Sequence, residues 1–397
     1  MADTSSATTG PNSAVRTAAG RRTRHGRWGP GAALALVVGA GCHVAPPVPH
    51  VPAWVDPAAG AVDDDERELW TKSKEALAAL DAAGLIVSDP KLSAYLTDVL
   101  TRLVPASLPP GVPAPEVRVV SNVDRQALVL PNGTILVSTS YLAVLENEAQ
   151  LAGLLGHELG HFIGRHALVG KRYAAVSTST VERMRLARSL EEEADETGLA
   201  LIRRAGYDPR EMLATLALIE ADDMAGRGAV FAWESHPYIR DRRRKLGSEL
   251  GPAVASEATR NPDRYEEAIA DLLLIAAQQE LDARRPERAR AAIERHLRHR
   301  PESGRSHLLL AEYARLTERD GGRSPAARHH YERAVELAPD DPEAVRALAF
   351  VYREDGDLER ARPLFATYLR LAPRALDRKL IERYLVGAPR AAPTNGR

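Results

Sequence analysis

Apolar residues recur at helical spacing through most of this chain and alternate with polar residues in one short stretch. Acidic residues from Asp63 to Glu66 precede apolar positions in helical register, a pattern that predicts a helix ending at Gly84. Further helices are expected over residues 90–103, 146–168 and 180–204, and then on to about residue 250. The pattern therefore favours a mostly helical protein.

The alternating stretch lies between residues 117 and 139. Residues 127–130 and 134–139 both alternate, and they flank Pro131-Asn132-Gly133. Asn-Gly between two β-prone runs is a strong turn signal. We therefore predict a β-hairpin here, in a small sheet.

After a linker over residues 251–262, the chain is helical again and shows a repeat. Counted back from Pro373, five residues fall where a tetratricopeptide repeat places its packing residues: Leu348, Tyr352, Gly356, Ala361 and Phe365. A preceding unit ends at Pro339, with an insertion around Gly321-Gly322, and a weaker first unit ends at Pro301. These units predict a solenoid of helix pairs over residues 263–385, followed by a tail over 386–397. Five histidines in these Arg-rich helices are interpreted as surface residues: His296, His299, His307, His329 and His330.

Composition adds few constraints. A chain of 397 residues with 44% hydrophobic and 27% charged residues fits two folded domains. The net charge of -1 gives no electrostatic reason to expect nucleic acid as a partner.

The beginning of the chain has the pattern of an export signal. Basic residues precede a short apolar run over residues 32–40, which suits a signal peptide over residues 1–42 better than a permanent membrane helix. Cys42 is the only cysteine, so a disulfide framework is excluded. Its position after Gly39-Ala40-Gly41 resembles a bacterial lipobox, which would make Cys42 a lipid anchor; the alternative is secretion with an incidental cysteine. Repeated prolines over residues 43–62 predict a tether to the first domain.

The segment that carries chemistry contains H-E-x-x-H at His157, Glu158 and His161 within a helical context. Two histidines four residues apart share a helix face, so both can reach one zinc ion. Glu158 then lies where it can take a proton from a water molecule at that ion. Two histidines on a surface or in a core are the alternative. Glycines at positions 153, 156 and 160 lower helix propensity, which indicates close packing or function.

A catalytic zinc site needs a third protein ligand. The acidic stretch from Glu191 to Asp195 is a candidate, because the apolar residues after it imply that one face of its helix is buried. Glu191 and Asp195 are four apart, so one can bind zinc while the other hydrogen-bonds a ligand histidine. Spacing alone leaves Glu191 and Glu192 as alternatives for the ligand, and a solvated acidic helix remains the simpler interpretation.

Together these features resemble the metallopeptidase family of CAAX prenyl proteases and HtpX-like membrane proteases. The similarity is greatest to its exported BepA-like branch, in which tetratricopeptide repeats follow the protease domain. The matching segments are residues 128–133, 157–166, 191–198 and 205–209, and His236-Pro237 followed by Arg242. The resemblance implies a mostly α fold: a helical zincin-type domain with a small β-sheet over residues 63–250, followed by the repeats.

The resemblance also implies roles for single residues. It implies that Glu191 is the third zinc ligand and that Asp195 belongs to the active site. His236 would lie near the zinc, either holding the metal in a resting state or stabilising the oxyanion; the alternative is a capping or surface histidine before Pro237. Arg242 carries less weight, because it lies among Arg240, Arg243 and Arg244.

The expected activity is that of a zinc-dependent endopeptidase with one zinc ion per chain, acting on unfolded or misfolded polypeptides. An extended substrate would pair with the edge of the strand over residues 134–138, and Glu158 would act as the base. By analogy with the family, the protein is expected in the periplasm, attached to the outer membrane by lipid on Cys42. Its repeats would dock clients or outer-membrane assembly proteins. The alternatives are a chaperone or assembly factor with a largely silent zinc site, and a pure binding protein, against which the intact Glu158 argues.

Overall fold

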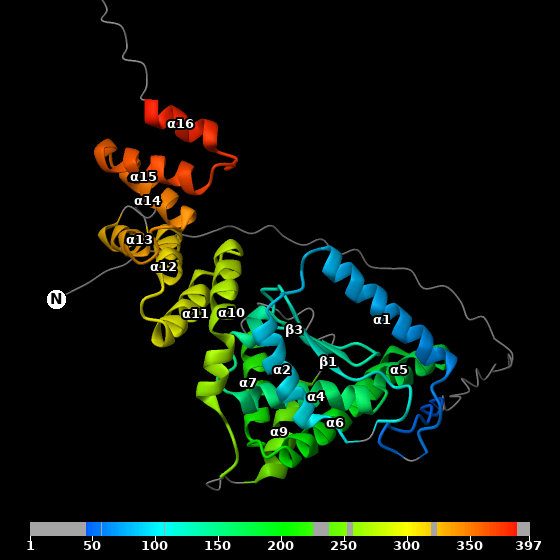
Figure 1. Cartoon of the computed structure of the whole chain (residues 1–397). Coiled ribbons are helices and arrows are strands. Elements are labelled where there is room, and N and C mark those ends of the chain that lie inside the picture. The colour runs from blue at the N-terminus through cyan, green and yellow to red at the C-terminus, as the bar shows by residue number, and fades with distance from the viewer. Residues whose placement is uncertain are drawn as a thin grey trace, which may run out of the picture. The chain divides into compact units, whose positions relative to one another are not determined.

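The computed structural model describes residues 45–56, 58–106, 108–224, 238–251, 257–318 and 324–386 (Figure 1). The signal segment, Cys42 and His236 lie outside these residues. The first part of the described chain contains the helices α1 (Asp64–Ala82), α2 (Pro90–Leu103), α3 (Thr139–Leu142), α4 (Glu148–Ile163), α5 (His166–Val176), α6 (Thr180–Arg204), α7 (Glu211–Met224) and α9 (Ile239–Leu250). The second part contains α10 (Pro262–Asp282), α11 (Pro286–His299), α12 (Gly304–Thr317), α13 (Pro325–Leu337), α14 (Pro342–Glu354), α15 (Leu358–Leu371) and α16 (Arg378–Val386). With one small sheet in the first part, the expected mostly helical fold class is confirmed.

The starts of the first two helices follow from their capping residues. Asp63 accepts a hydrogen bond from the backbone of Glu66, and the Glu66 side chain bonds back to Asp63, which forms a capping box. Asp89 caps α2, and Pro90 occupies its first turn, where a missing N–H costs nothing. Both helices therefore begin where the sequence predicts.

The sheet has three strands, β1 (Glu116–Val120), β2 (Ala127–Val129) and β3 (Thr134–Ser138), in the order β1-β3-β2. β3 pairs in parallel with β1 and antiparallel with β2. The predicted hairpin is confirmed as β2–β3, with Gly133 in its turn at φ 85°, a conformation that favours glycine. β3 is thus the central strand and β2 lies at an edge.

The predicted helix over residues 146–168 is wrong as a single element. It ends at Ile163, and a new helix begins at His166, because Arg165 adopts a left-handed conformation with φ 57°. The buried Arg165 guanidinium pairs with Glu66 at 2.7 Å and donates to the Pro52 and Ala59 carbonyls at 3.1 Å. These tertiary contacts offset the cost of the backbone conformation, and the local sequence does not reveal them.

The helices α4 and α6 cross at unusually small residues. A Cβ atom on Gly160 would lie 2.6 Å from the Ala194 carbonyl oxygen, and one on Gly198 would lie 2.9 Å from the His157 nitrogen. Glycine at these positions lets the two backbones approach, which explains why α4 tolerates residues of low helix propensity. The crossing brings the acidic stretch of α6 against the histidines of α4.

Part of the Pro-rich segment packs against this domain. Trp54 is buried, at 3% exposure, and its backbone N–H donates to the Ile163 carbonyl at 2.8 Å. Ala59 is buried as well. The portion of the segment around Trp54 and Ala59 is therefore packed against the domain, unlike a tether.

The predicted helix pairs of the repeats are confirmed as α10–α11, α12–α13 and α14–α15. The first pair is joined to the first part of the described chain: the Tyr265 hydroxyl donates to the Leu142 carbonyl at 2.6 Å, and Arg295 donates to the Ala143 and Leu145 carbonyls. The later helices share a separate apolar core. No helix within the described ranges is both long and apolar enough to span a bilayer.

The interpretation of the repeat histidines as surface residues is wrong for His296. It is 3% exposed, and its Nδ1 lies 2.7 Å from the Ser306 hydroxyl, in the contact between α11 and α12. His329 is exposed, and the other three are half-buried.

Candidate metal centre

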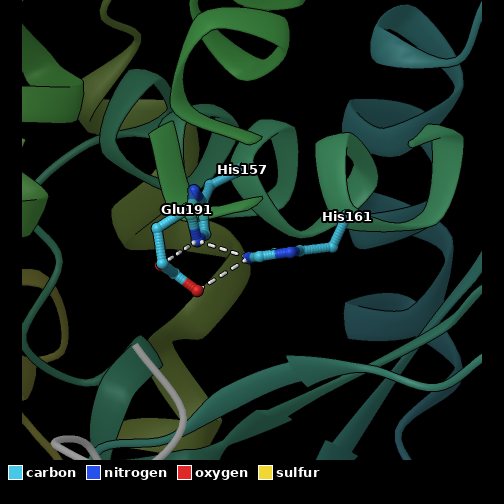
Figure 2. A group of neighbouring side chains, drawn as sticks. All are labelled: His157, His161 and Glu191. Carbon is cyan, nitrogen blue, oxygen red and sulfur yellow. Dashed lines mark hydrogen bonds and ion pairs between the residues drawn. The ribbon is translucent and has the colours of Figure 1, made fainter. Parts of the chain in front are cut away.

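The helix α4 carries His157, Glu158 and His161, and its two histidines face α6. It begins at Asn147, whose side chain caps the helix by accepting from the Gln150 N–H. The two histidines are one turn apart, and their Nε2 atoms lie 3.1 Å from each other (Figure 2). Glu158 is 2% exposed. The predicted arrangement of two imidazoles on one helix face is therefore present.

The third donor comes from α6. The two carboxylate oxygens of Glu191 lie 3.5 Å from His157 Nε2 and 3.3 Å from His161 Nε2 (Figure 2). Glu192 instead faces Lys245, at 2.9 Å, near the surface. The structure therefore brings Glu191 to the histidines and leaves Glu192 away from them, which sequence spacing left open.

The three donor atoms fit a zinc ion. Donors about 2.0–2.1 Å from a tetrahedral zinc would lie about 3.4 Å apart, close to the separations between these three side chains. Two imidazoles and one carboxylate are also a donor set that catalytic zinc uses, with the fourth position left for water. Within the described residues, this is the group of histidine and acidic side chains that meets the geometry of a metal site.

Asp195 lies beside the outer nitrogen of His157. Its Oδ1 is 3.0 Å from His157 Nδ1, the partner that fixes the tautomer of a ligand histidine. Burial raises the pKa of Asp195, but hydrogen bonds from Arg242 and His157 outweigh burial and lower it to about 2. Asp195 is thus an ionised acceptor behind the first histidine.

Arg242, to which sequence reasoning gave little weight, is central to the site. Its guanidinium is buried in α9 and donates to both oxygens of Asp195, at 2.8 and 2.6 Å, and to Glu191 at 2.5 Å. The neighbouring Arg244 is exposed and pairs with Asp241. The four arginines of this helix differ in the face on which they lie, a difference that helical periodicity around the buried Ile239 and Leu246 could have revealed.

Acidic side chains outnumber the buried guanidinium at the site. Among the residues that the structure describes, Glu158, Glu191 and Asp195 are buried acidic side chains, and Arg242 is the buried guanidinium beside them. Burial and the Arg242 charge lower the pKa of His157, but hydrogen bonds to Asp195 and Glu191 outweigh them and raise it to about 9. The surroundings of His157 thus favour a positive charge at this place.

His166 was missed by the sequence reasoning as a site residue. It is 6% exposed, its Nδ1 lies 2.8 Å from His161 Nδ1, and its Nε2 lies 3.6 Å from Glu193. His166 therefore contacts the outer nitrogen of His161, just as Asp195 contacts the outer nitrogen of His157. The break at Arg165 turns His166 back toward His161, so a continuous helix could not have indicated this contact.

Two cavities meet at Glu158. The larger one, about 210 Å³, is lined by His161, by residues 128–131 of the hairpin and by residues of α1 and α5. The smaller one, about 40 Å³, is lined by His157, by residues 125–127 and by residues of α7 and α9. The edge strand β2 therefore runs beside the site from one cavity to the other.

Helix α4 with His157, Glu158 and His161, a carboxylate from α6 and an edge strand beside them are the elements of a metallopeptidase site. Comparison with known proteins supports this class. Residues 90–181 match Peptidase family M48, and residues 274–320 and 316–375 match the tetratricopeptide repeat.

The similar proteins are metalloendopeptidases. Mitochondrial metalloendopeptidase OMA1 of Arabidopsis thaliana is 35% identical over 114 residues, which are 24% of this chain and 24% of that protein. OMA1 of Schizosaccharomyces pombe is 27% identical over 195 residues, 44% of this chain and 57% of that protein. OMA1 of Saccharomyces cerevisiae is 27% identical over 164 residues, 35% of this chain and 48% of that protein. The matched regions thus span between about a quarter and somewhat over half the length of these relatives.

Residues 90–181 of this chain are therefore similar to Peptidase family M48, and a region similar to tetratricopeptide repeats follows them. These similarities support the metallopeptidase part of the sequence-based resemblance. The BepA-like branch, export and the lipid anchor stay predictions.

Proposed function

We propose that the protein is a zinc-dependent endopeptidase that cleaves extended or misfolded polypeptides in the cell envelope. The observation that carries this proposal is the convergence of His157, His161 and Glu191 beside the buried Glu158. The match to Peptidase family M48 and the metalloendopeptidase relatives support it.

The residues have distinct roles in this proposal. His157, His161 and Glu191 hold one zinc ion, which would polarise the substrate carbonyl and make water acidic enough to lose a proton near neutral pH. Glu158 takes the proton from the attacking water and passes it to the leaving amine.

The supporting side chains hold the ligands in place. Asp195 and His166 accept from or donate to the outer nitrogens of His157 and His161, and so orient the rings. Arg242 donates hydrogen bonds to Asp195 and Glu191 and so aligns both carboxylates. His236, which lies outside the described residues, would stabilise the oxyanion or hold the metal at rest.

The expected substrate strand is wrong and is replaced by its neighbour. β3 lies between β1 and β2, so it has no free edge to offer a substrate. In the antiparallel pair, Leu130 donates to Thr134 and Ser138 donates to Gln126. Because such bonds alternate along a strand, the backbone of Val129 points away from β3, toward the side where a substrate would pair. A substrate strand would thus add to β2.

The remaining parts of the proposal concern location and partners. The repeats would dock client polypeptides or outer-membrane assembly proteins. The protein would be periplasmic, and lipid on Cys42 would anchor it to the outer membrane. The composition of the N-terminal segment and the match to tetratricopeptide repeats support these roles.

Cleavage of casein by the wild type and by Glu158→Gln tests the catalytic proposal. Removing the base should slow cleavage about 10²–10⁴-fold. The zinc content, measured on the same samples, should be equal, and His157→Ala should lose the metal. Equal cleavage by the wild type and Glu158→Gln would refute the role of Glu158. Client binding without cleavage by either protein would favour a chaperone with a silent site.

A further inference from the structure

We infer that the larger cavity beside Glu158 is a specificity subsite for a large apolar side chain on the amino side of the scissile bond. This inference rests on the proposed peptidase function and adds the class of substrate residue. It assigns a role to Trp54 and Trp70, which the catalytic roles above do not use.

The walls of this cavity are apolar and come from parts of the chain far apart in sequence. Trp54 of the Pro-rich segment and Leu69 and Trp70 of α1 form one side, with the two indole rings 6.5 Å apart. The hairpin supplies Leu128 to Pro131, and α4 and α5 supply Phe162 and Leu168. Leu69, Trp70 and Val129 are half-buried, so they present surface to an occupant.

Apart from Glu158, His161 and His166 at the candidate metal centre, the charged groups that line this cavity are Arg165 and Glu66, which pair with each other. Arg165 and Glu66 form two contacts of 2.7 Å, and the guanidinium also lies 4.0 Å from the centre of the Trp54 ring. A substrate lysine or glutamate would therefore lose water without gaining an ion pair from this couple. Burial of a charge without a partner is costly, whereas burial of an apolar side chain is favourable. The cavity thus selects apolar side chains.

The direction of β2 places the cavity relative to the scissile bond. Along the strand, residues 125–127 line the small cavity with His157, and residues 128–131 line the large cavity with His161. A substrate that pairs antiparallel with β2 runs in the opposite direction, from the Pro131 end to the Gln126 end. The residue just before the scissile bond then lies at the large cavity. The residue just after it lies at the cavity of about 40 Å³, which admits a smaller side chain.

The test uses the full-length zinc enzyme and peptides that differ only in the residue before the scissile bond: Phe, Leu, Ala or Lys. The wild type should prefer Phe and Leu over Ala and Lys by about tenfold or more in kcat/KM, the range that apolar pockets achieve. Trp70→Ala should remove most of this preference. Leu77→Ala is the matched control, because Leu77 is also half-buried on α1 but does not line the cavity.

A second variant keeps the test valid if Trp70→Ala does not fold. Ala167 is exposed at the rim of the cavity, so Ala167→Trp should fill it without disturbing the core. This variant should slow the Phe and Leu peptides about tenfold relative to the Ala peptide. In the uncleaving Glu158→Gln background, the affinity for the Phe peptide should fall in the same proportion.

The outcomes separate the two proposals. If the wild type and Glu158→Gln both fail to cleave any peptide, the peptidase function is refuted. If the wild type cleaves but both cavity variants keep its preference, or if the preference lies after the scissile bond, the subsite is refuted and the peptidase function stands.

Discussion

The crossing of α4 with α6 and the pairing of α14 with α15 are both contacts between two helices. The first buries polar and charged side chains, whereas the second buries apolar side chains. The α4–α6 contact buries His157, Glu158, Glu191 and Asp195 next to glycine. The buried residues of α14 and α15 are alanines, larger aliphatic residues and aromatic residues such as Phe365. In the first contact each polar group needs a specific partner, whereas in the second any well-packed apolar surface serves. Single substitutions in the α4–α6 contact should therefore affect function and leave buried charges without partners. Substitutions in the α14–α15 contact should affect packing alone.

The largest expected effect is that of Arg242→Ala. The substitution leaves Glu191 and Asp195 buried without their guanidinium, which should lower the free energy of unfolding of the metal-free protein by about 3–5 kcal/mol. With zinc bound the loss should be smaller, because the cation neutralises the same carboxylates. Urea unfolding with and without zinc measures both values.

Arg244→Ala is the control for this experiment. Arg244 lies on the same helix, but its side chain is 73% exposed and pairs with Asp241 in solvent. Loss of such a pair should cost less than about 1 kcal/mol, independent of zinc. An equal loss from the two substitutions would show that the buried network contributes nothing special.

The next largest effect is the loss of stability when a buried residue of the repeats is removed. Phe365→Ala removes a fully buried ring and should destabilise the last repeats by about 3 kcal/mol or more. Cleavage of short peptides should not change, because the ring belongs to a core separate from that of the peptidase part. Hydrogen exchange would locate the loss.

Leu358→Ala on the same helix serves as its control, because Leu358 is 45% exposed. It should change stability little. Loss of peptide cleavage in Phe365→Ala would mean that the repeats and the catalytic site are not independent.

The smallest effect concerns how the stability depends on pH through His296, which lies in the contact between α11 and α12. Burial lowers the pKa of His296 below its usual value near 6.5. The unfolded chain therefore binds a proton more readily than the folded one, so stability is full above about pH 6.5 and falls as the pH drops from there toward the lowered pKa. His296→Gln should flatten this part of the profile of unfolding free energy against pH. An unchanged profile would show that His296 does not contribute.

Much of the fold was predictable, because the local sequence determines it. The helices over residues 90–103 and 180–204 have the predicted limits, since a cap, a proline or a glycine marks their ends. The pair His157 and His161 was predictable for the same reason, because i,i+4 spacing is a local property.

The rest depends on contacts between distant segments. The break at Arg165 comes from Glu66 and two carbonyls about a hundred residues earlier. Helical periodicity could have indicated the buried face on which Arg242 lies, but its partner Asp195 comes from a distant segment. The choice of β2 over β3 as the edge strand follows from the parallel pairing of β1, which no local pattern encodes. Such contacts are beyond the reach of periodicity and spacing.

The hydrogen bond from Trp54 to Ile163 has a mechanical consequence. Ile163 is two residues after His161. Arg165, two residues further on, donates hydrogen bonds to the carbonyls of Pro52 and Ala59, on either side of Trp54. Tension applied ahead of Val51 would consequently act on the end of α4 and, through the packing of Val51, on α5 and α6. A pull on the segment before Val51 would therefore act on the helix that carries the candidate metal site.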